Sequence, residues 1–188
     1  VRPLIPDHDR RTGGIFLSEH LPLNERLELE AGARLDAALL QVRTFDAQDE
    51  YITPEHRFTN HAFSLGANWT ATDSLRLRAG LNSAFRPPHV SELYSQGLHH
   101  GSAAIEEGDP TLGSERMLQA TLDTEWGSGN GRWSGALSLH ASRTEGFIYL
   151  RPEGYRLTIR GAFPVFRYTA TDVLMWGTDA QVRFRPVP

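Results

Sequence analysis

The sequence predicts an all-β chain: a segment of an antiparallel, up-and-down membrane β-barrel with about seven long strands. Three observations predict it. Apolar and polar residues alternate in stretches of about ten residues, short and long connections alternate between these stretches, and aromatic residues gather near both ends of the expected strands. A tilted strand needs about 9–11 residues to cross a bilayer, and bacterial outer-membrane barrels combine short periplasmic turns with longer extracellular loops.

The first strands alternate charged and aliphatic residues. Residues 25–37 place aliphatic side chains on one face and Glu28, Glu30, Arg34 and Asp36 on the other. Residues 74–85 repeat the pattern, with Leu75, Leu77, Ala79, Leu81 and Phe85 opposite Arg76, Arg78, Gly80 and Asn82. Because successive side chains of a strand point to opposite faces, each stretch is predicted to have an apolar and a polar face.

Five further stretches complete the expected set of strands. In chain order they are residues 14–20, 63–70, 117–126, 132–142 and 167–184, of which the first and last alternate least regularly. We expect these seven stretches to form one wall.

The expected connections differ in length. Short turns near residues 22–24, 72–74 and 127–131 are rich in turn-forming residues. Long connections cover residues 44–57, 86–113 and 150–166. This alternation predicts short periplasmic turns at one end of the wall and extracellular loops at the other.

Aromatic residues support the same orientation. Trp69, Trp126 and Trp133 lie close to short turns, whereas Phe85, Phe147, Tyr149 and Tyr168 lie close to long connections. Aromatic residues are common in any strand. Together with the loop lengths, however, this distribution favours two belts at the membrane surfaces.

Composition excludes several classes of protein. With 39% hydrophobic residues in 188 and a mean hydropathy of -0.40, the chain contains no apolar run of the roughly 18 residues that a spanning helix requires. The net charge of -4 and the mixed distribution of charges provide no basic stripe for nucleic acid. Cysteine is absent, and no catalytic motif is present, so an enzyme is not expected.

Metal-binding residue types gather in the longest connection. His99 and His100 are adjacent, and Glu106, Glu107 and Asp109 follow a few residues later. Imidazole and carboxylate groups bind zinc, copper or nickel, which makes these residues candidate metal ligands. Exposed loops also collect such residues, and the spacing differs from that of a closed zinc site. A transient capture site is therefore the expectation.

One segment resembles a signature of TonB-dependent outer-membrane receptors. It runs F-R-P-P-H-V-S-E-L-Y at residues 85–94, G-L-H-H-G at 97–101 and G-D-P-T-L at 108–112, followed by Glu115. Residues 147–152 and 163–169 resemble a branch that includes zinc and haem importers. The likeness covers residues 27–184. Gly113 and Ser114 depart from it, standing where the family usually has Lys-Pro, and Asp109 stands where Asn is commoner.

The resemblance implies active import across the bacterial outer membrane of a metal or metal chelate: zinc, haem or an iron-siderophore. His89 and Tyr94, in the same loop as His99 and His100, are further candidate ligand-binding residues, and no intrinsic cofactor is expected. Residues 1–188 would be part of a barrel domain without its plug domain, TonB box or terminal strand. The expected partners are that plug, the TonB complex, which contacts the missing N-terminal region, and outer-membrane lipid.

Two alternatives remain open from the sequence. One is a soluble or secreted β-sandwich that binds a ligand, although sandwich strands are usually nearer five or six residues. The other is a passive, porin-like outer-membrane barrel. On either barrel interpretation, the charged residues of the polar face would line a solvated lumen, and in a receptor they would also line a transport path or contact a plug.

Overall fold

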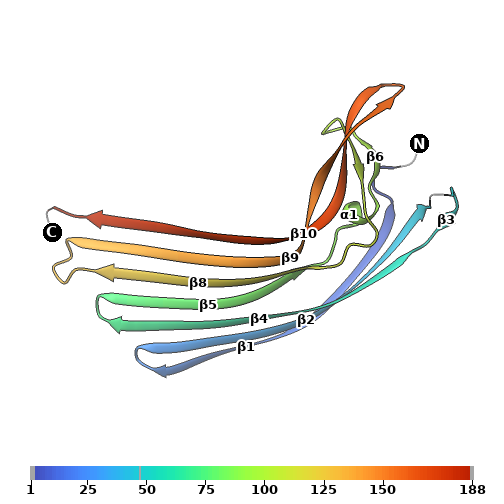
Figure 1. Ribbon diagram of the computed structural model, residues 1–188. Coiled ribbons are helices and arrows are strands. Elements are labelled where there is room, and N and C mark those ends of the chain that lie inside the picture. The colour runs from blue at the N-terminus through green and yellow to red at the C-terminus, as the bar shows by residue number, and fades with distance from the viewer. Residues whose placement is uncertain (1–2, 47, 187–188) are drawn as a thin grey trace.

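A computed structural model, described for residues 3–46 and 48–186, confirms the all-β prediction (Figure 1). Seven long strands are present among these residues, namely β1 Asp7–Asn24, β2 Leu27–Phe45, β4 Glu55–Thr72, β5 Leu75–Arg86, β8 Glu115–Gly127, β9 Trp133–Thr158 and β10 Gly161–Phe184. The connections contain β3 Tyr51–Ile52, helix α1 Val90–Tyr94, β6 Gln96–His99 and β7 Ala104–Glu107. No helix in the described ranges is long and apolar enough to cross a membrane.

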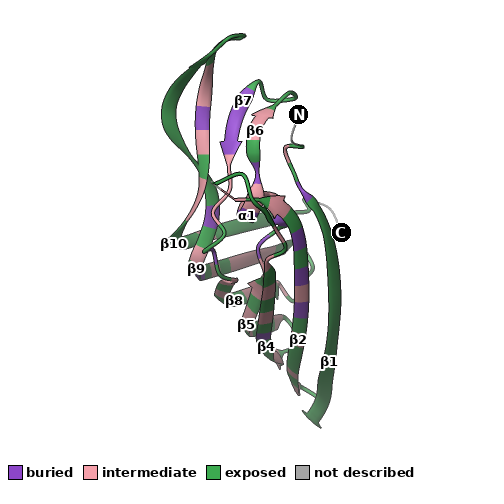
Figure 2. Cartoon of the chain, turned by 90° about the vertical axis from the view of Figure 1, so that its right-hand side faces the viewer, coloured by how far each residue is buried: buried purple, intermediate pink, exposed green. Residues whose placement is uncertain are grey.

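The strands form one sheet in the order β1-β2-β4-β5-β8-β9-β10-β7-β6. The long strands pair antiparallel with their neighbours, and only the contact between β10 and β7 is parallel within the described part of the chain. Short turns lie at one end of the sheet and the folded connections at the other (Figure 1), and a view from the side shows its curvature (Figure 2). The sheet is an open wall and does not close on itself.

Strand register confirms the predicted separation of two faces. Glu28, Asn68, Arg78, Asp123 and Ser138 are successive partners on five neighbouring strands, so they form one row. The face that carries this row is called the polar face below. Large apolar side chains of the opposite face are exposed along the wall, among them Leu35, Leu65, Leu81, Leu118, Leu122 and Leu139.

Two predictions about element length were wrong. The long strands have 12 to 26 residues rather than about ten. The longest of them continue past the level of the folded connections, toward the end of the wall opposite the short turns. Residues 150–166 are not a loop: β9 and β10 extend through them as a hairpin with a turn at Ile159 and Arg160. Pro152, Gly154 and Pro164 disguise this hairpin in the sequence, and a register shift between Val165 and Phe166 accommodates the irregularity.

The aromatic residues occupy the predicted strand ends only in part: Trp69, Trp126, Trp133 and Phe85 lie at or near the ends of their strands, whereas Phe147, Tyr149 and Tyr168 lie inside β9 and β10, which continue beyond them. Near the short turns, the Trp126 ring lies over Gly135, and the rings of Trp133 and Phe184 are 4.5 Å apart. At the loop end, Tyr168 packs into a core cluster beneath the folded connection. The Tyr168 ring therefore packs against the folded connection on the polar face and does not belong to an outward-facing belt.

The core of the chain lies where the connection of residues 87–114 packs on the polar face. Its buried members are Leu40, Val42, Val90, Leu93, Leu112 and Ile148. On β2, the face that carries Glu28 near the short turn and Asp36 at mid-strand carries Leu40 and Val42 toward the loop end. The change from charged to apolar residues on one face matches the coverage by the loop, because apolar burial stabilises the contact.

Candidate functional site

The two ends of the connection of residues 87–114 meet at an arginine. Arg86, the last residue of β5, donates hydrogen bonds from Nε and Nη2 to the two carboxylate oxygens of Glu115, at 2.8 Å each, and from Nη1 to Glu92 at 2.8 Å. Glu115 also accepts a hydrogen bond of 2.7 Å from the backbone N–H of Ile148. The base of the loop is thus fixed to β5, β8 and β9.

Helix α1 begins at a capping box. The His89 side chain accepts from the backbone N–H of Ser91, and Glu92 accepts from the backbone N–H of His89 at 2.7 Å. These bonds satisfy N–H groups that the first turn of a helix leaves without partners. His89, predicted as a ligand-binding residue, is placed by the structure as the N-cap of α1.

The loop returns across the helix through Gly108. A Cβ atom at this position would lie 2.5 Å from the backbone carbon of Leu93 and from the backbone nitrogen of Tyr94, so the close approach requires glycine. Asp109 then accepts hydrogen bonds from the N–H and hydroxyl of Thr111, at 2.8 and 2.6 Å. Asp109, predicted as a metal ligand, thus stabilises a turn.

Tyr94 is held between the core and the neighbouring strand. Its hydroxyl lies 2.6 Å from Nε2 of His56, at the loop end of β4. Burial raises the pKa of Tyr94 and lowers the pKa of His56, so both side chains are held in their neutral forms. The predicted ligand-binding residue therefore forms a neutral hydrogen bond between the loop and the wall.

The β6–β7 hairpin presents a histidine oriented by a carboxylate. Nδ1 of His99 lies 2.6 Å from Oε1 of Glu106, whose side chain is 10% exposed, whereas the His99 ring is about half exposed. A carboxylate accepts the Nδ1 proton and leaves the Nε2 lone pair available. Within the described ranges, Nε2 has no hydrogen-bond partner. The imidazole is thus positioned to bind an external group through Nε2.

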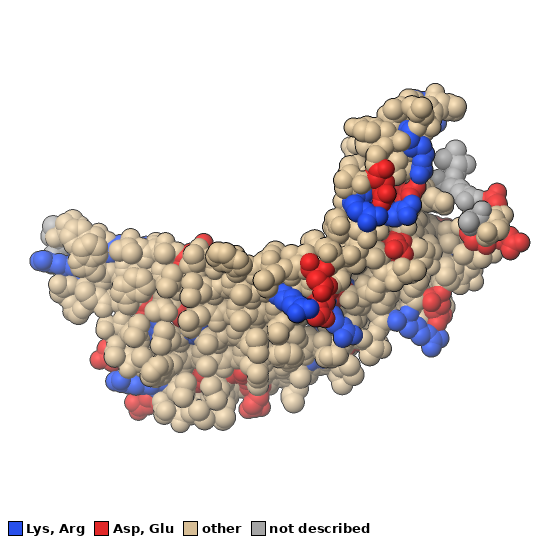
Figure 3. Space-filling view, in the orientation of Figure 1, with Lys and Arg blue, Asp and Glu red and all other residues tan. Residues whose placement is uncertain are grey.

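The same hairpin is attached to the projecting end of the wall. Residues Ile105–Glu107 pair in parallel with Val165–Arg167 of β10. Glu107 accepts hydrogen bonds from Arg156 at 2.6 Å and from Arg167 at 2.8 Å. The Arg167 guanidinium, followed by Arg156, lowers the pKa of Glu107. Figure 3 shows acidic and basic side chains meeting below the projecting hairpin.

The structure divides the five predicted metal ligands. It brings His99 and Glu106 together and leaves His100 exposed in the following turn. Glu107 bonds two arginines instead, and Asp109 bonds Thr111. Sequence reasoning missed three residues that position this region, His56, Arg156 and Arg167. They lie 38 to 60 residues from their partners, so no local pattern indicates them.

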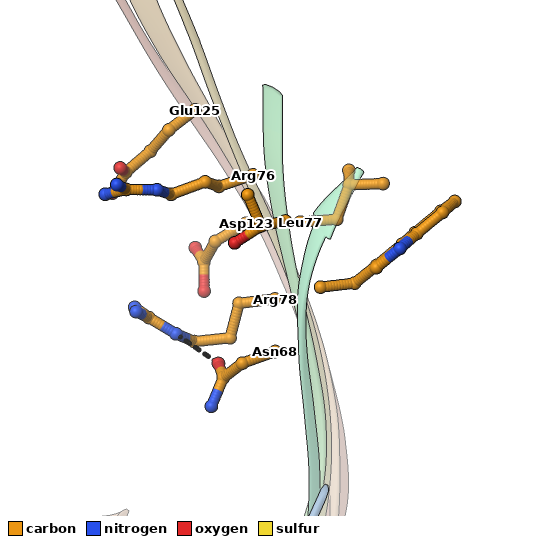
Figure 4. A pocket seen from close by; sticks show the side chains of 8 residues that line it. Asn68, Arg76, Leu77, Arg78, Asp123 and Glu125 are labelled. Carbon is orange, nitrogen blue, oxygen red and sulfur yellow. Dashed lines mark hydrogen bonds between the residues drawn. The ribbon is translucent and has the colours of Figure 1, made fainter. Parts of the chain in front are cut away.

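Further from the loop, charged groups line a shallow pocket on the polar face (Figure 4). Nε of Arg78 donates to Oδ1 of Asn68 at 2.8 Å, while Leu77 points to the opposite side of the sheet. Arg76 lies opposite Glu125 in the register between β5 and β8. The predicted placement of Arg76 and Arg78 on the polar face is confirmed.

Comparison with known families gives one match that covers nearly the whole chain. The family model described as "TonB dependent receptor-like, beta-barrel" matches residues 2–185. Among curated proteins, heme/hemopexin utilization protein C of Haemophilus influenzae is 30% identical over 95 residues, which is 50% of this chain and 12% of that protein. This chain therefore aligns with only a small part of the relative.

Solved structures share the fold. The copper transporter OprC superposes with a TM-score of 0.74 at 20% identity, over 96% of this chain and 27% of its own. A double mutant of the Serratia marcescens hemophore receptor HasR, in complex with its hemophore HasA and heme, superposes with a TM-score of 0.75 at 15% identity, over 95% of this chain and 32% of its own.

Proposed function

This chain belongs to the TonB-dependent receptor β-barrel family, and on that premise we propose that it is a wall segment of a longer receptor that actively imports a metal chelate, with haem as the favoured cargo. Barrels of this family lie in the bacterial outer membrane. The apolar face of the sheet would meet lipid, the polar face would line the lumen, and the folded connections would lie on the extracellular side.

The observation that carries the proposal is the His99–Glu106 pair. Histidines that bind a metal usually donate their other ring N–H to a carboxylate or carbonyl, which fixes the tautomer and the ring orientation. Haem iron commonly takes a histidine as its axial ligand. The half-exposed His99 ring, with Nδ1 held by buried Glu106, has this arrangement. One curated relative is named as a heme/hemopexin utilization protein and another as a probable hemoglobin and hemoglobin-haptoglobin-binding protein, which supports haem over free zinc or an iron-siderophore.

The other predicted site residues would have one direct and four supporting roles. His100, next to His99, is a second candidate contact with the metal. Glu107 and Asp109 would hold the loop in shape through the arginines and Thr111. His89 and Tyr94 would act in the same way, through the α1 cap and His56, unless cargo displaces those bonds. The chelate is a substrate, and no resident cofactor is proposed.

Energy for release would come from outside this chain. We expect a plug domain of the same protein inside the lumen and the TonB complex as the coupling partner. The family consists of transport receptors, which fits the absence of catalytic motifs. The β-sandwich alternative does not fit a single sheet with strands of up to 26 residues. The match to a TonB-dependent receptor barrel favours coupled transport over a passive porin.

The test is a haem titration of the full-length receptor in detergent, in which binding is measured by the Soret absorbance. We expect His99→Ala to shift the Soret band and weaken binding at least tenfold, and His100→Ala to have a smaller effect. His140→Ala, on β9, is the control. Parallel calorimetry with Zn²⁺ and with a ferric siderophore separates the three cargoes. An unchanged Soret band and affinity in the His99→Ala/His100→Ala double variant would remove the loop from haem binding.

A further inference from the structure

We propose that His20, Glu28 and Glu30 form a binding site for a divalent transition-metal cation on the polar face, near the short-turn end of the wall and separate from the loop site. This proposal does not depend on the cargo of the receptor. It rests on the positions, charges and hydrogen bonds of these three side chains.

The β1–β2 hairpin brings the three residues together. Oδ1 of Asn24 accepts hydrogen bonds of 2.9 Å from the backbone N–H groups of Arg26 and Leu27, which fixes the turn. In the resulting register, His20 is the partner of Glu30, and Glu28 lies two residues from Glu30 on the same face of β2. Alternation along each strand directs all three side chains to the polar face.

The candidate ligand atoms are spaced for a common ion. Nε2 of His20 lies 3.1 Å from Oε1 of Glu28, and Nδ1 lies 3.8 Å from Oε1 of Glu30. One ligand atom from each residue lies within 4.8 Å of the others. Ligands at about 2.0–2.2 Å from a zinc ion are separated from one another by roughly 3–4 Å. Small side-chain rotations would therefore allow one ion to be coordinated by one nitrogen of His20 and one carboxylate oxygen each of Glu28 and Glu30.

The local charge favours a cation. Elsewhere on the same face, Asp36 is paired with Arg34 at 2.6 Å. Glu28 and Glu30, by contrast, have no arginine within ion-pair distance in the described part of the chain; His20 is the basic side chain that lies within that distance, and Arg78 reaches them only through Asn68. With neutral imidazole the cluster carries two negative charges in close proximity. A divalent ion would neutralise both and replace the repulsion between them by attraction.

A neighbouring amide orients the two carboxylates. Nδ2 of Asn68 lies 3.3 Å from Oε1 of Glu28 and 3.2 Å from Oε1 of Glu30. Its Oδ1 accepts the hydrogen bond from Arg78, which fixes the direction of the amide. Such outer hydrogen bonds hold ligands in place and tune metal affinity. Because Asn68 already restricts the Glu28 and Glu30 side chains, less side-chain entropy would be lost when an ion binds.

The ligand types limit the choice of ion. One imidazole and two carboxylates suit Zn²⁺, Fe²⁺ or Mn²⁺ better than ions that prefer thiolates. The side chains of His20, Glu28 and Glu30 are 59%, 36% and 53% exposed, so water can complete the coordination. The site lies on the face that a lumen would expose and at the opposite end of the wall from His99.

The experiment uses Zn²⁺ calorimetry on the full-length receptor in detergent. All proteins carry His99→Ala and His100→Ala, so that the loop contributes no heat. We expect one Zn²⁺ per receptor, with affinity lowered at least tenfold by His20→Gln and abolished by Glu28→Gln/Glu30→Gln. His140→Ala and Glu125→Gln, which change other groups of the polar face, are the matched controls and should retain the affinity.

Two outcomes would overturn the proposal. One is the absence of Zn²⁺ binding in the parent receptor, as expected if a basic side chain from another part of the protein neutralises the two carboxylates. The other is an equal loss of affinity in the controls and in the cluster variants. Thermal melting of each variant verifies folding, and His20→Gln, which preserves the size of the side chain, guards against a structural effect.

Discussion

Arg86 and Glu115 form a two-bond ion pair across the base of the longest connection, with both nitrogen–oxygen distances at 2.8 Å. The two residues are partners at the last pair of the β5–β8 ladder. This contact explains why an F-R-P-P segment and a glutamate after G-D-P-T-L occur together in the sequence. The first supplies the donor at the end of one strand, and the second supplies the acceptor at the start of the next.

Removing this pair should loosen the loop while leaving the wall intact. For Arg86→Ala we expect a loss of about 1–2 kcal/mol, the usual value for hydrogen bonds to charged groups reduced for the half-exposed arginine. Limited proteolysis within residues 87–114 of the full-length receptor measures it. Arg132→Ala, at a short turn, is the control. Equal cleavage rates in both variants and the parent would mean that the pair does not hold the loop.

A single added methyl group should displace the loop from the helix. Gly108→Ala places a Cβ atom 2.5 Å from the backbone of Leu93 and Tyr94, and such overpacking typically costs about 1–3 kcal/mol. Gly113→Ala is the matched control, because a Cβ atom there would meet nothing within 4 Å beyond its immediate chain neighbours. Hydrogen exchange of the α1 amides should accelerate in the first variant alone. Similar exchange in both would contradict the close approach.

Acid should release the β6–β7 hairpin from β10. The two arginines hold the pKa of Glu107 below the ordinary glutamate value near 4.5. The contact therefore contributes full stability above about pH 4.5 and loses it as pH falls through the lower folded value. Hydrogen exchange of residues 104–107 measured from pH 6 to pH 3 should show this loss. Glu107→Gln should abolish this pH dependence, and a variant that retains the parent profile would rule out Glu107 as its source.

The carboxylate behind His99 should tune the metal site without binding the metal itself. We expect Glu106→Gln to lower haem affinity by about 10–100-fold, the usual effect of losing a group that orients a metal-binding histidine. The Soret band should also shift, because the amide no longer fixes the tautomer. Glu153→Gln, on the projecting part of β9, is the control. Unchanged affinity and an unchanged band would assign the pair a purely structural role.

The 188-residue chain expressed alone should self-associate in water. β1 forms an open edge along 18 residues, and the side chains of Ile15 and Leu17 are 72% and 74% exposed. Unpaired strand edges and apolar surfaces of this size promote association. Size-exclusion chromatography should show dimers or larger species that dissociate in detergent. A compact, strand-poor monomer in detergent would contradict the open-sheet structure.

The sequence was sufficient for the wall of the protein. Alternation with period two identifies a strand and its two faces from neighbouring residues alone, so the polar-face positions from Glu28 to Ser138 were predicted without tertiary information. The length of the β9–β10 hairpin was not, because Pro152 and Gly154 read locally as loop residues. Only cross-strand pairing, with a register shift at Val165, shows that the strands continue through them.

The candidate sites divide along the same line. The gathering of histidines and carboxylates in one loop, and the alternation of charges along β2, can be read from adjacent residues. Which of these side chains meet depends on the folded chain: Glu106 orients His99, Glu107 bonds two arginines from distant strands, and His20 reaches Glu30 through the β1–β2 register. The physical reason is that alternation depends on adjacent residues, whereas a binding geometry depends on strand register and loop packing, which residues far apart in the chain determine together.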